Sequence, residues 1–184
     1  HVLGDGAQGH GLATHLDGAR LFNAAVASGV PATEWAKPLD TVSVCFSKGL
    51  GAPAGSALVG SAELIARAKR VRKMAGGTMR QAGILAAAAM HALDHHIDRL
   101  ADDHARARRL AEGLQGLPGV TVQMPQTNMV FIDLPRERAA AAVAALREQG
   151  VLSTGLYQLR LVTHLDVNDE QIDQAIAALR RALH

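Results

Sequence analysis

Short apolar runs alternate with amphipathic stretches along the chain, which is the pattern of an α/β protein. The run at 41–46 is β-branched and almost wholly apolar, as in a strand that is covered on both faces of a largely parallel sheet. Other apolar runs predict strands at 12–16 and 57–60. Alanine-rich or helix-periodic segments predict helices at 21–27, 61–74 and 80–93, with Ser61 as a helix N-cap.

The pattern of predicted elements changes beyond Pro118 and Gly119. A long amphipathic stretch at 98–117 comes first, and short strands then alternate with helices. The predicted strands are 120–122, 129–134, 151–153 and 159–162, and the predicted helices are 136–149 and 168–183. We therefore expect two parts. Residues 1–104 belong to a large domain with a mostly parallel sheet, and residues 105–184 form a small C-terminal α/β domain.

Two short segments at predicted strand ends carry the candidate chemistry. Asp17 and Arg20 follow the first strand, and Lys48 follows the second, beside Gly49 and Gly51. In open α/β sheets, ligands bind at the carboxyl ends of the strands. A lysine amine and a carboxylate supplied together from such ends are what pyridoxal phosphate needs, because it binds a lysine covalently and pairs its ring nitrogen with an acid.

Each segment has a plainer interpretation when it is taken alone. A lysine in a glycine-rich loop is most often a surface residue or a contact for a nucleotide phosphate. In the cofactor interpretation, Ser47 of the same turn could donate its hydroxyl to the cofactor phosphate. The sequence Asp17-Gly18-Ala19-Arg20 is typical of a turn and a helix start. The two segments together favour the cofactor interpretation.

Composition narrows the class without changing this picture. The 184 residues are 48% apolar and carry a formal charge of only +2, with few aromatic residues, so a nucleic-acid partner is not expected. No apolar stretch is long enough to span a membrane. The lone Cys45 excludes an internal disulfide and fits a reducing compartment such as the cytoplasm. The start at His1, without a methionine, suggests a fragment.

A helical face with His91, Asp94, His95 and Asp98 could in principle bind a divalent metal. Without a third rigid ligand, a solvated helix surface is the favoured interpretation, and we expect no metal.

Four blocks closely resemble the low-specificity L-threonine aldolases, which are pyridoxal phosphate enzymes with the aspartate-aminotransferase-like fold. The blocks are His15–Ala25, Ser43–Pro53, Arg72–Leu85 and Arg160–Val167, and they follow one another in the right order. The resemblance as a whole extends over nearly the whole chain beyond about residue 11. The resemblance implies retro-aldol cleavage of a β-hydroxy-α-amino acid such as L-threonine or L-allo-threonine to glycine and an aldehyde.

The resemblance also implies roles for individual residues. Lys48 would be the catalytic Schiff-base lysine, Asp17 the partner of the pyridine nitrogen, and Arg20 a contact of the phenolate oxygen. Arg160 would hold the substrate carboxylate. Lys73 and Arg80 match basic residues that the family directs toward the cofactor phosphate of a neighbouring subunit, which implies a homodimer or a homotetramer with shared active sites.

Two departures from the family pattern stand out. Thr78 occupies a position where the family has glycine, and the family's upstream half, with its phosphate-binding turn and ring-stacking histidine, has no counterpart in residues 1–11. No residue is therefore assigned as the general base. Two alternatives stay open. The first is another enzyme of the same fold, either a β-eliminating lyase or an aminotransferase. The second is a non-catalytic chain, either a truncated remnant or a partner-binding module that kept the fold.

Overall fold

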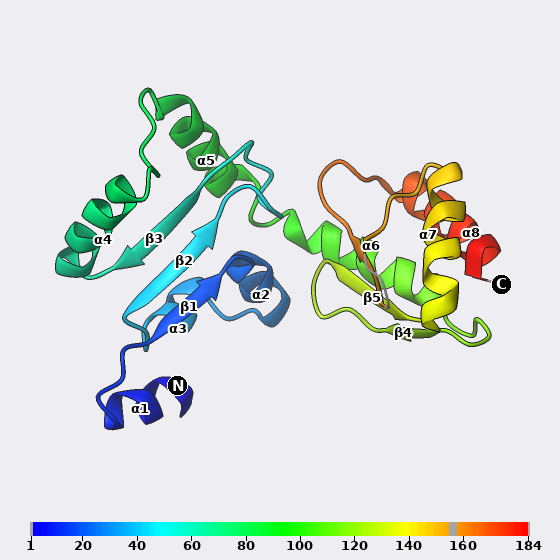
Figure 1. Cartoon of the computed structure of the whole chain (residues 1–184), viewed down its shortest axis with the longest axis horizontal. Coiled ribbons are helices and arrows are strands. Elements are labelled where there is room, and N and C mark those ends of the chain that lie inside the picture. The colour runs from blue at the N-terminus through cyan, green and yellow to red at the C-terminus, as the bar shows by residue number, and fades with distance from the viewer. Residues whose placement is uncertain (1, 155–157, 184) are drawn as a thin grey trace. The chain divides into compact units, whose positions relative to one another are not determined.

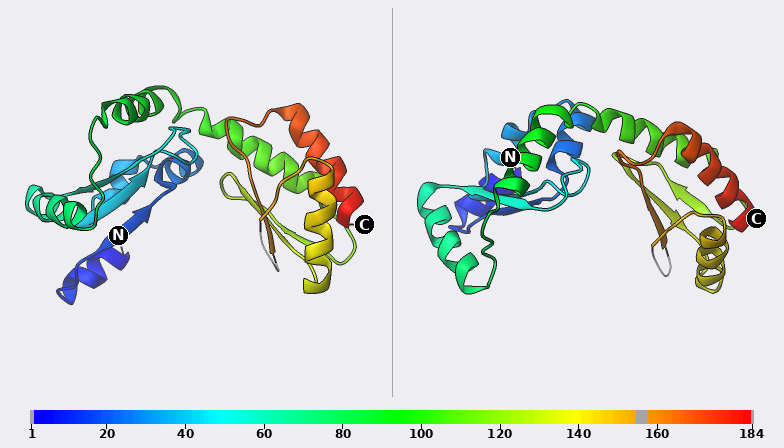
Figure 2. Two further views of the ribbon diagram at one scale, coloured as in Figure 1. Left: turned by 45° about the horizontal axis from the view of Figure 1, so that its top comes forward. Right: turned by 90° about the horizontal axis from the view of Figure 1, so that it is seen from above.

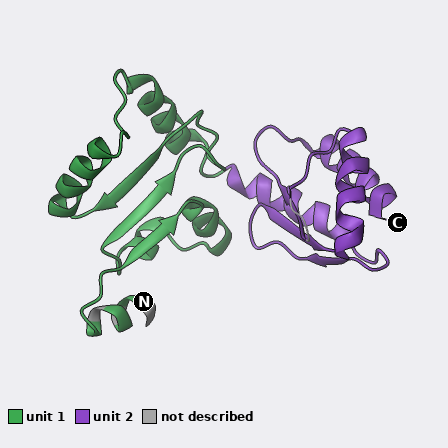
Figure 3. Ribbon diagram, viewed as in Figure 1, with its two compact units in different colours: residues 1–98 green, residues 99–184 purple. Residues whose placement is uncertain are grey.

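The computed structural model describes residues 2–154 and 158–183. The chain divides into two compact units, residues 1–98 and 99–184 (Figure 3). This division falls at the start of a helix, somewhat before the residue 104/105 boundary that the sequence suggested. Each unit combines helices with a three-stranded sheet, so the predicted α/β class is confirmed.

The sheet of the first unit consists of β1 (His15–Gly18), β2 (Thr41–Cys45) and β3 (Ser56–Gly60), in that order (Figure 1). β1 and β2 run parallel, and β2 and β3 run antiparallel. The mostly parallel sheet was expected of a whole large domain. Within this chain, the described part of that sheet has one pair of each kind.

Five helices accompany this sheet: α1 (Val2–Gly9), α2 (Leu21–Ser28), α3 (Ala32–Ala36), α4 (Ala62–Met74) and α5 (Gly83–His95). α2 and α3 lie beside β1, and α4 lies beside β3 (Figure 1). The predicted cap of α4 is confirmed, because the Ser61 hydroxyl accepts a hydrogen bond from the Leu64 amide at 3.3 Å. The core is small: Leu21, Val42 and Val44 are buried together, with Leu16 and Phe46 packed against them.

Thr14 and Asp40 tie the amino ends of β1 and β2 together. One Asp40 oxygen accepts from the Thr14 amide at 2.7 Å and from its hydroxyl at 2.9 Å, while the Thr14 hydroxyl accepts from the Asp40 amide. These bonds, the backbone one first, hold the pKa of the Asp40 carboxyl below its usual value. The two strands therefore start in a fixed register.

The second unit contains α6 (Leu100–Gly113), β4 (Thr121–Gln123), β5 (Met129–Asp133), α7 (Arg136–Glu148), β6 (Gln158–Val162) and α8 (Asp169–Leu183). Its sheet is antiparallel in the order β4-β5-β6. The three helices pack on one side of this sheet, as Figure 2 shows from two directions. Within the unit, no described helix covers the opposite face.

A continuous core joins the three helices to the sheet. Its fully buried members include Leu114, Val130, Ile132, Leu146 and Leu159, with Leu179 and Leu183 from the last helix. Asp103 is also completely buried, and Arg99 donates to both of its carboxylate oxygens, at 2.5 and 3.1 Å. The second unit thus pairs an extensive apolar core with a buried ion pair.

Most predicted elements are confirmed, with shifts of a few residues at their ends. The strand predicted at 151–153 is wrong, because only Thr154 bridges to Arg160 in that region. The helices α1 and α3 were not predicted. None of the described helices combines the length and apolar character that crossing a membrane requires.

Candidate active site

The parallel pairing of β1 and β2 brings the predicted site segments to one edge of the sheet. Asp17 pairs with Ser43 and Gly18 with Val44, so both strands end at the same edge. Arg20 follows β1 directly, and Ser47 and Lys48 follow β2. The structure therefore brings the segments that carry these four residues to the sheet edge where open α/β sheets bind ligands.

Asp17 lies on the face of β1 that points away from the small core. Leu16 packs into that core, and side chains alternate along a strand, so Asp17 shares the open face with His15. One Asp17 oxygen accepts from the Ala19 amide at 3.1 Å, which closes a turn before α2. A ring nitrogen of His15 forms a hydrogen bond with the Thr41 hydroxyl at 2.9 Å.

Gly18 has no room for a side chain. A Cβ atom there would lie 2.6 Å from the Ser43 carbonyl oxygen and 3.1 Å from a Val42 methyl group. Since the nearest atom belongs to the backbone of β2, a larger residue would push the two strands apart. The glycine of the Asp17-Gly18 pair is therefore needed for the close approach of β1 and β2.

Lys48 lies in a closed loop between β2 and β3. The Ala52 amide donates to the Phe46 carbonyl at 2.9 Å, and the Gly51 amide donates to the Lys48 carbonyl at 2.8 Å. Gly51 takes a φ of 72°, which glycine adopts without strain. Within this loop the Leu50 side chain is buried and the Lys48 side chain is exposed. The loop backbone is therefore fixed, and the Lys48 amine is accessible to solvent.

His96 is bonded to the backbone of this loop, a role that sequence analysis missed. A ring nitrogen of His96 lies 2.6 Å from the Leu50 carbonyl oxygen. His96 comes just after α5, far from the loop in sequence, and its neighbours had suggested only a solvated face. The histidine therefore links the end of α5 to the lysine loop.

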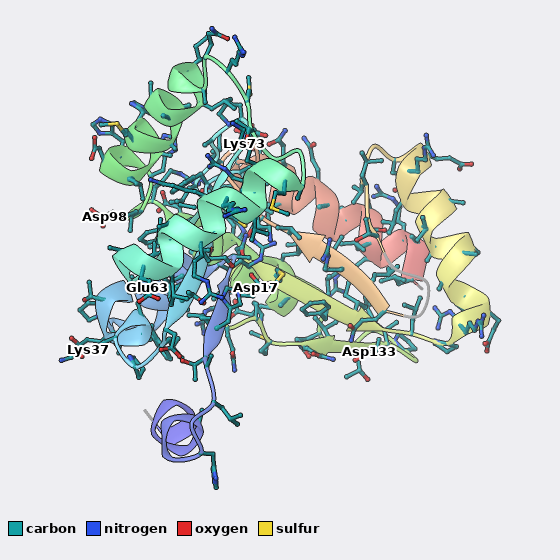
Figure 4. All side chains as sticks on the ribbon, turned by 60° about the vertical axis from the view of Figure 1, so that its left-hand side comes forward. Asp17, Lys37, Glu63, Lys73, Asp98 and Asp133 are labelled. Atoms are coloured by element: carbon teal, nitrogen blue, oxygen red, sulfur yellow. The ribbon has the colours of Figure 1, made fainter. Side chains whose placement is uncertain are left out.

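Lys73 and Arg80 are exposed in the α4–α5 region. Lys73 extends from the last turn of α4, at the opposite end of the helix from Glu63 (Figure 4). Arg80 lies in the connection that follows Gly76 and Gly77, and no described residue forms a hydrogen bond or ion pair with either side chain. Thr78 is exposed in the same connection. The structure does not join these residues to the Asp17–Lys48 edge.

Arg160 belongs to the second unit and lies on the uncovered face of its sheet. Leu159 and Leu161 point into the core, and Arg160 between them points outward. Its backbone bonds Thr154, with the Arg160 amide donating to the Thr154 carbonyl at 2.8 Å. Within the described ranges, no side chain pairs with its guanidinium.

The histidine side chains at the C-terminal end of α5 contact one another through their rings. The His91 ring lies 4.5 Å from that of His95 and 5.3 Å from that of His96. No group of three or more potential metal ligands was found among the residues that the structure describes.

The fold is α/β and resembles that of the pyridoxal phosphate enzymes of fold type I. A structure from Exiguobacterium sp. 255-15, assigned as an aromatic amino acid beta-eliminating lyase/threonine aldolase, superimposes with a TM-score of 0.79 at 25% identity, over 98% of this chain and 55% of its own. Sphingomonas wittichii serine palmitoyltransferase superimposes with a TM-score of 0.73 at 20% identity, over 97% of this chain and 49% of its own, which shows the fold alone.

The family follows from the sequence comparison. The family model of the beta-eliminating lyases matches residues 3–137. The chain belongs to this family. It is also 46% identical to the low specificity L-threonine aldolase of Escherichia coli (strain K12) over 94% of its length, and 42% identical to the low-specificity L-threonine aldolase 1 of Arabidopsis thaliana over 98%. The resemblance seen in the sequence motifs is thus confirmed.

The chain spans about half the length of the curated relatives that it matches. The matched part is 51% of the Escherichia coli protein and 52% of the Arabidopsis thaliana protein.

Proposed function

We propose that the chain carries the lysine half of a pyridoxal phosphate-dependent threonine aldolase. The reaction is the retro-aldol cleavage of L-threonine or L-allo-threonine to glycine and acetaldehyde. The observation that carries this proposal is the placement of Lys48 and Asp17 at one edge of a parallel strand pair, in a chain 46% identical to a low specificity L-threonine aldolase.

The residues at this edge fit the cofactor chemically. Lys48 offers an exposed amine on a fixed loop, and Asp17 offers a carboxylate oxygen beyond the one bonded to the Ala19 amide. Lys48 would hold the cofactor covalently through Nζ. The Asp17 carboxylate would keep a proton on the pyridine nitrogen, Arg20 would donate to the phenolate oxygen, and Ser47 would donate to the phosphate.

In this proposal the substrate is bound through its α-carboxylate. The Arg160 guanidinium would bind the α-carboxylate through two parallel N–H···O bonds, the geometry that arginine offers to carboxylates. When bound, pyridoxal phosphate supplies an electron sink for the bond cleaved next to the amino group. In the overall reaction the Cα–Cβ bond breaks, the β-hydroxyl loses its proton and becomes the aldehyde carbonyl, and Cα gains a proton.

The wider assembly forms part of the same proposal. The first unit would be the C-terminal part of the cofactor-binding large domain and the second unit the small domain. Lys73 and Arg80 would reach the cofactor phosphate in a second copy of the chain, in a cytoplasmic homodimer or homotetramer. Exposed Met74, Met79 and Ile84 in the same region support this, because neighbouring exposed apolar side chains mark interaction surfaces.

Borohydride reduction in the presence of pyridoxal phosphate tests the central residue. We expect selective labelling of the peptide that contains Lys48, located by mass spectrometry, because its fixed loop follows β2 at the same sheet edge as Asp17. The Lys48→Ala chain should lose this label, and the matched Lys37→Ala chain should keep it. Equal labelling of Lys37, Lys48, Lys69 and Lys73 in a folded chain would overturn the assignment.

Product analysis tests the reaction itself. L-threonine should yield glycine and acetaldehyde in equal amounts, whereas β-elimination would release ammonia and a keto acid. A keto acid as the main product would favour another lyase of this family.

A further inference from the structure

The uncovered face of the second sheet places one acidic side chain close to Arg160. Along β5 the side chains of Val130 and Ile132 point into the core, so Phe131 and Asp133 point to the opposite face, as Arg160 does on β6. Figure 4 labels Asp133 at the end of β5. This face therefore carries a cation and an anion together.

Two glutamines from the flanking strands donate hydrogen bonds to the Asp133 carboxylate. The side-chain amide of Gln158 on β6 donates to Oδ1 at 2.7 Å, and that of Gln123 on β4 donates to Oδ2 at 2.8 Å. Each carboxylate oxygen thus has a donor from a different strand.

The strand register shows that Asp133 is within reach of Arg160. Phe131 pairs with Gln123 on one side and with Arg160 on the other, so both of these residues stand diagonally to Asp133. Gln123 crosses its diagonal and makes a hydrogen bond. Arginine has a longer side chain, and such diagonals are spanned by long side chains. Nevertheless, the Arg160 guanidinium has no hydrogen bond or ion pair to the described residues.

We propose that Gln123 and Gln158 are positioning residues that hold Asp133 away from Arg160 and so leave the guanidinium available to the carboxylate of a small ligand. This inference rests on the proposed role of Arg160 as the carboxylate-binding residue. Arginine pairs best with a carboxylate that offers both oxygens side by side. The glutamines draw the two Asp133 oxygens toward opposite strands, which denies Arg160 that geometry.

Removal of both glutamines should convert Asp133 into an internal competitor. An exposed pair of this kind contributes up to about 1 kcal/mol, so a free carboxylate should bind about two- to five-fold more weakly in the Gln123→Leu/Gln158→Leu chain. Adding Asp133→Asn should restore the affinity, because the competing charge is then gone.

Nuclear magnetic resonance of the Arg160 Nε–Hε group provides the test, with acetate as the carboxylate probe and Arg160→Lys to assign the signal. We expect the signal to shift in the double variant before any acetate is added, and acetate affinity to fall. The Asp133→Asn addition should reverse both changes. Gln126→Leu, a nearby exposed glutamine with no hydrogen bond among the described residues, serves as the matched control and should change neither.

The outcomes separate this inference from the function on which it rests. An unchanged ligand-free Arg160 signal with unchanged acetate affinity, in a double variant with a native-like amide spectrum, would overturn it. If acetate does not move the Arg160 signal of the unmodified chain, the proposed role of Arg160 fails, while the ligand-free shift still tests the glutamines. Gln158→Leu alone gives the same test should the double variant not fold.

Discussion

The second unit of the chain buries a continuous core, whereas the first unit buries little and carries most of the candidate site. Core residues of the second unit come from all three of its helices and from its strands. Among the described residues of the first unit, Leu21, Val42 and Val44 form one small cluster, Leu50, Ala52, Ala89 and Ala92 are also buried, and α4 contains no buried residue. The site edge is therefore ordered by hydrogen bonds and close glycine contacts more than by apolar packing.

This difference predicts where substitutions act most strongly, and the largest effect should come from the buried ion pair of the second unit. Asp103→Ala leaves the partly buried Arg99 without its partner and removes a fully buried group, which should lower the free energy of unfolding by about 3–5 kcal/mol. Denaturant unfolding measures this. The exposed pair Arg109–Asp173 gives the control, since Arg109→Ala should cost no more than about 1 kcal/mol.

Truncation of a core leucine in each unit should show the difference between the two cores directly, as a difference in lost stability. Leu146→Ala opens a cavity in a fully buried position and should cost about 2–5 kcal/mol in the second unit. Leu21→Ala should cost clearly less, because the small cluster around it can collapse. Hydrogen exchange, read separately for the amides of each unit, measures both. Equal losses in the two units would contradict the contrast drawn between their cores.

A substitution at Gly18 should damage the first unit without any loss of apolar packing. Gly18→Ala places a methyl group against the Ser43 carbonyl, and such overpacking costs about 1–3 kcal/mol. The strand pair should separate, and the selective labelling of Lys48 by pyridoxal phosphate and borohydride should fall with it. Gly83→Ala is the control, since a Cβ there meets nothing within 4 Å.

The smallest expected effect is a pH dependence of the second unit. Burial lowers the pKa of His104 below its usual value, against an opposing contribution from the Asp103 charge. The unfolded chain then takes up a proton more readily than the folded one. Stability is therefore full above the ordinary histidine range, near pH 6.5, and declines as the pH falls through that range toward the lowered pKa.

Thermal unfolding of the second unit above and below that range measures the effect. His104→Gln should flatten the pH profile. The same slope in the variant and in the unmodified chain would assign the pH dependence to other groups.

Local signals predicted much of this fold, and long-range contacts account for the rest. Ser61 and the glycines after Met74 mark both ends of α4 in the sequence. The helix α1 was missed because Gly4, Gly6 and Gly9 have low helix propensity, and Gly4 fits closely against Pro38 instead. The segment 151–153 was predicted as a strand because it begins with two apolar residues. In the structure it does not pair with a neighbouring strand, and the Val151 amide donates to the Leu146 carbonyl instead.

The candidate site divides in the same way. The placement of the Asp17 and Lys48 segments at one sheet edge follows from two predicted strands that end together. The bond between His96 and the Leu50 carbonyl could not be predicted, because it joins segments that only the folded chain brings together. The two bonds to Asp133 likewise depend on the register of three strands, which alternation of polar residues does not specify.

The parallel register of β1 and β2 has a consequence for changes in chain length. The pairing of Asp17 with Ser43 sets the position of the carboxylate relative to the lysine loop, and the length of the connection through α2 and α3 does not. Gly29, between these helices, has a φ of 69° and open space around it. Insertions there should leave the site intact, whereas the deletion of a single residue inside β1 would turn Asp17 toward the core.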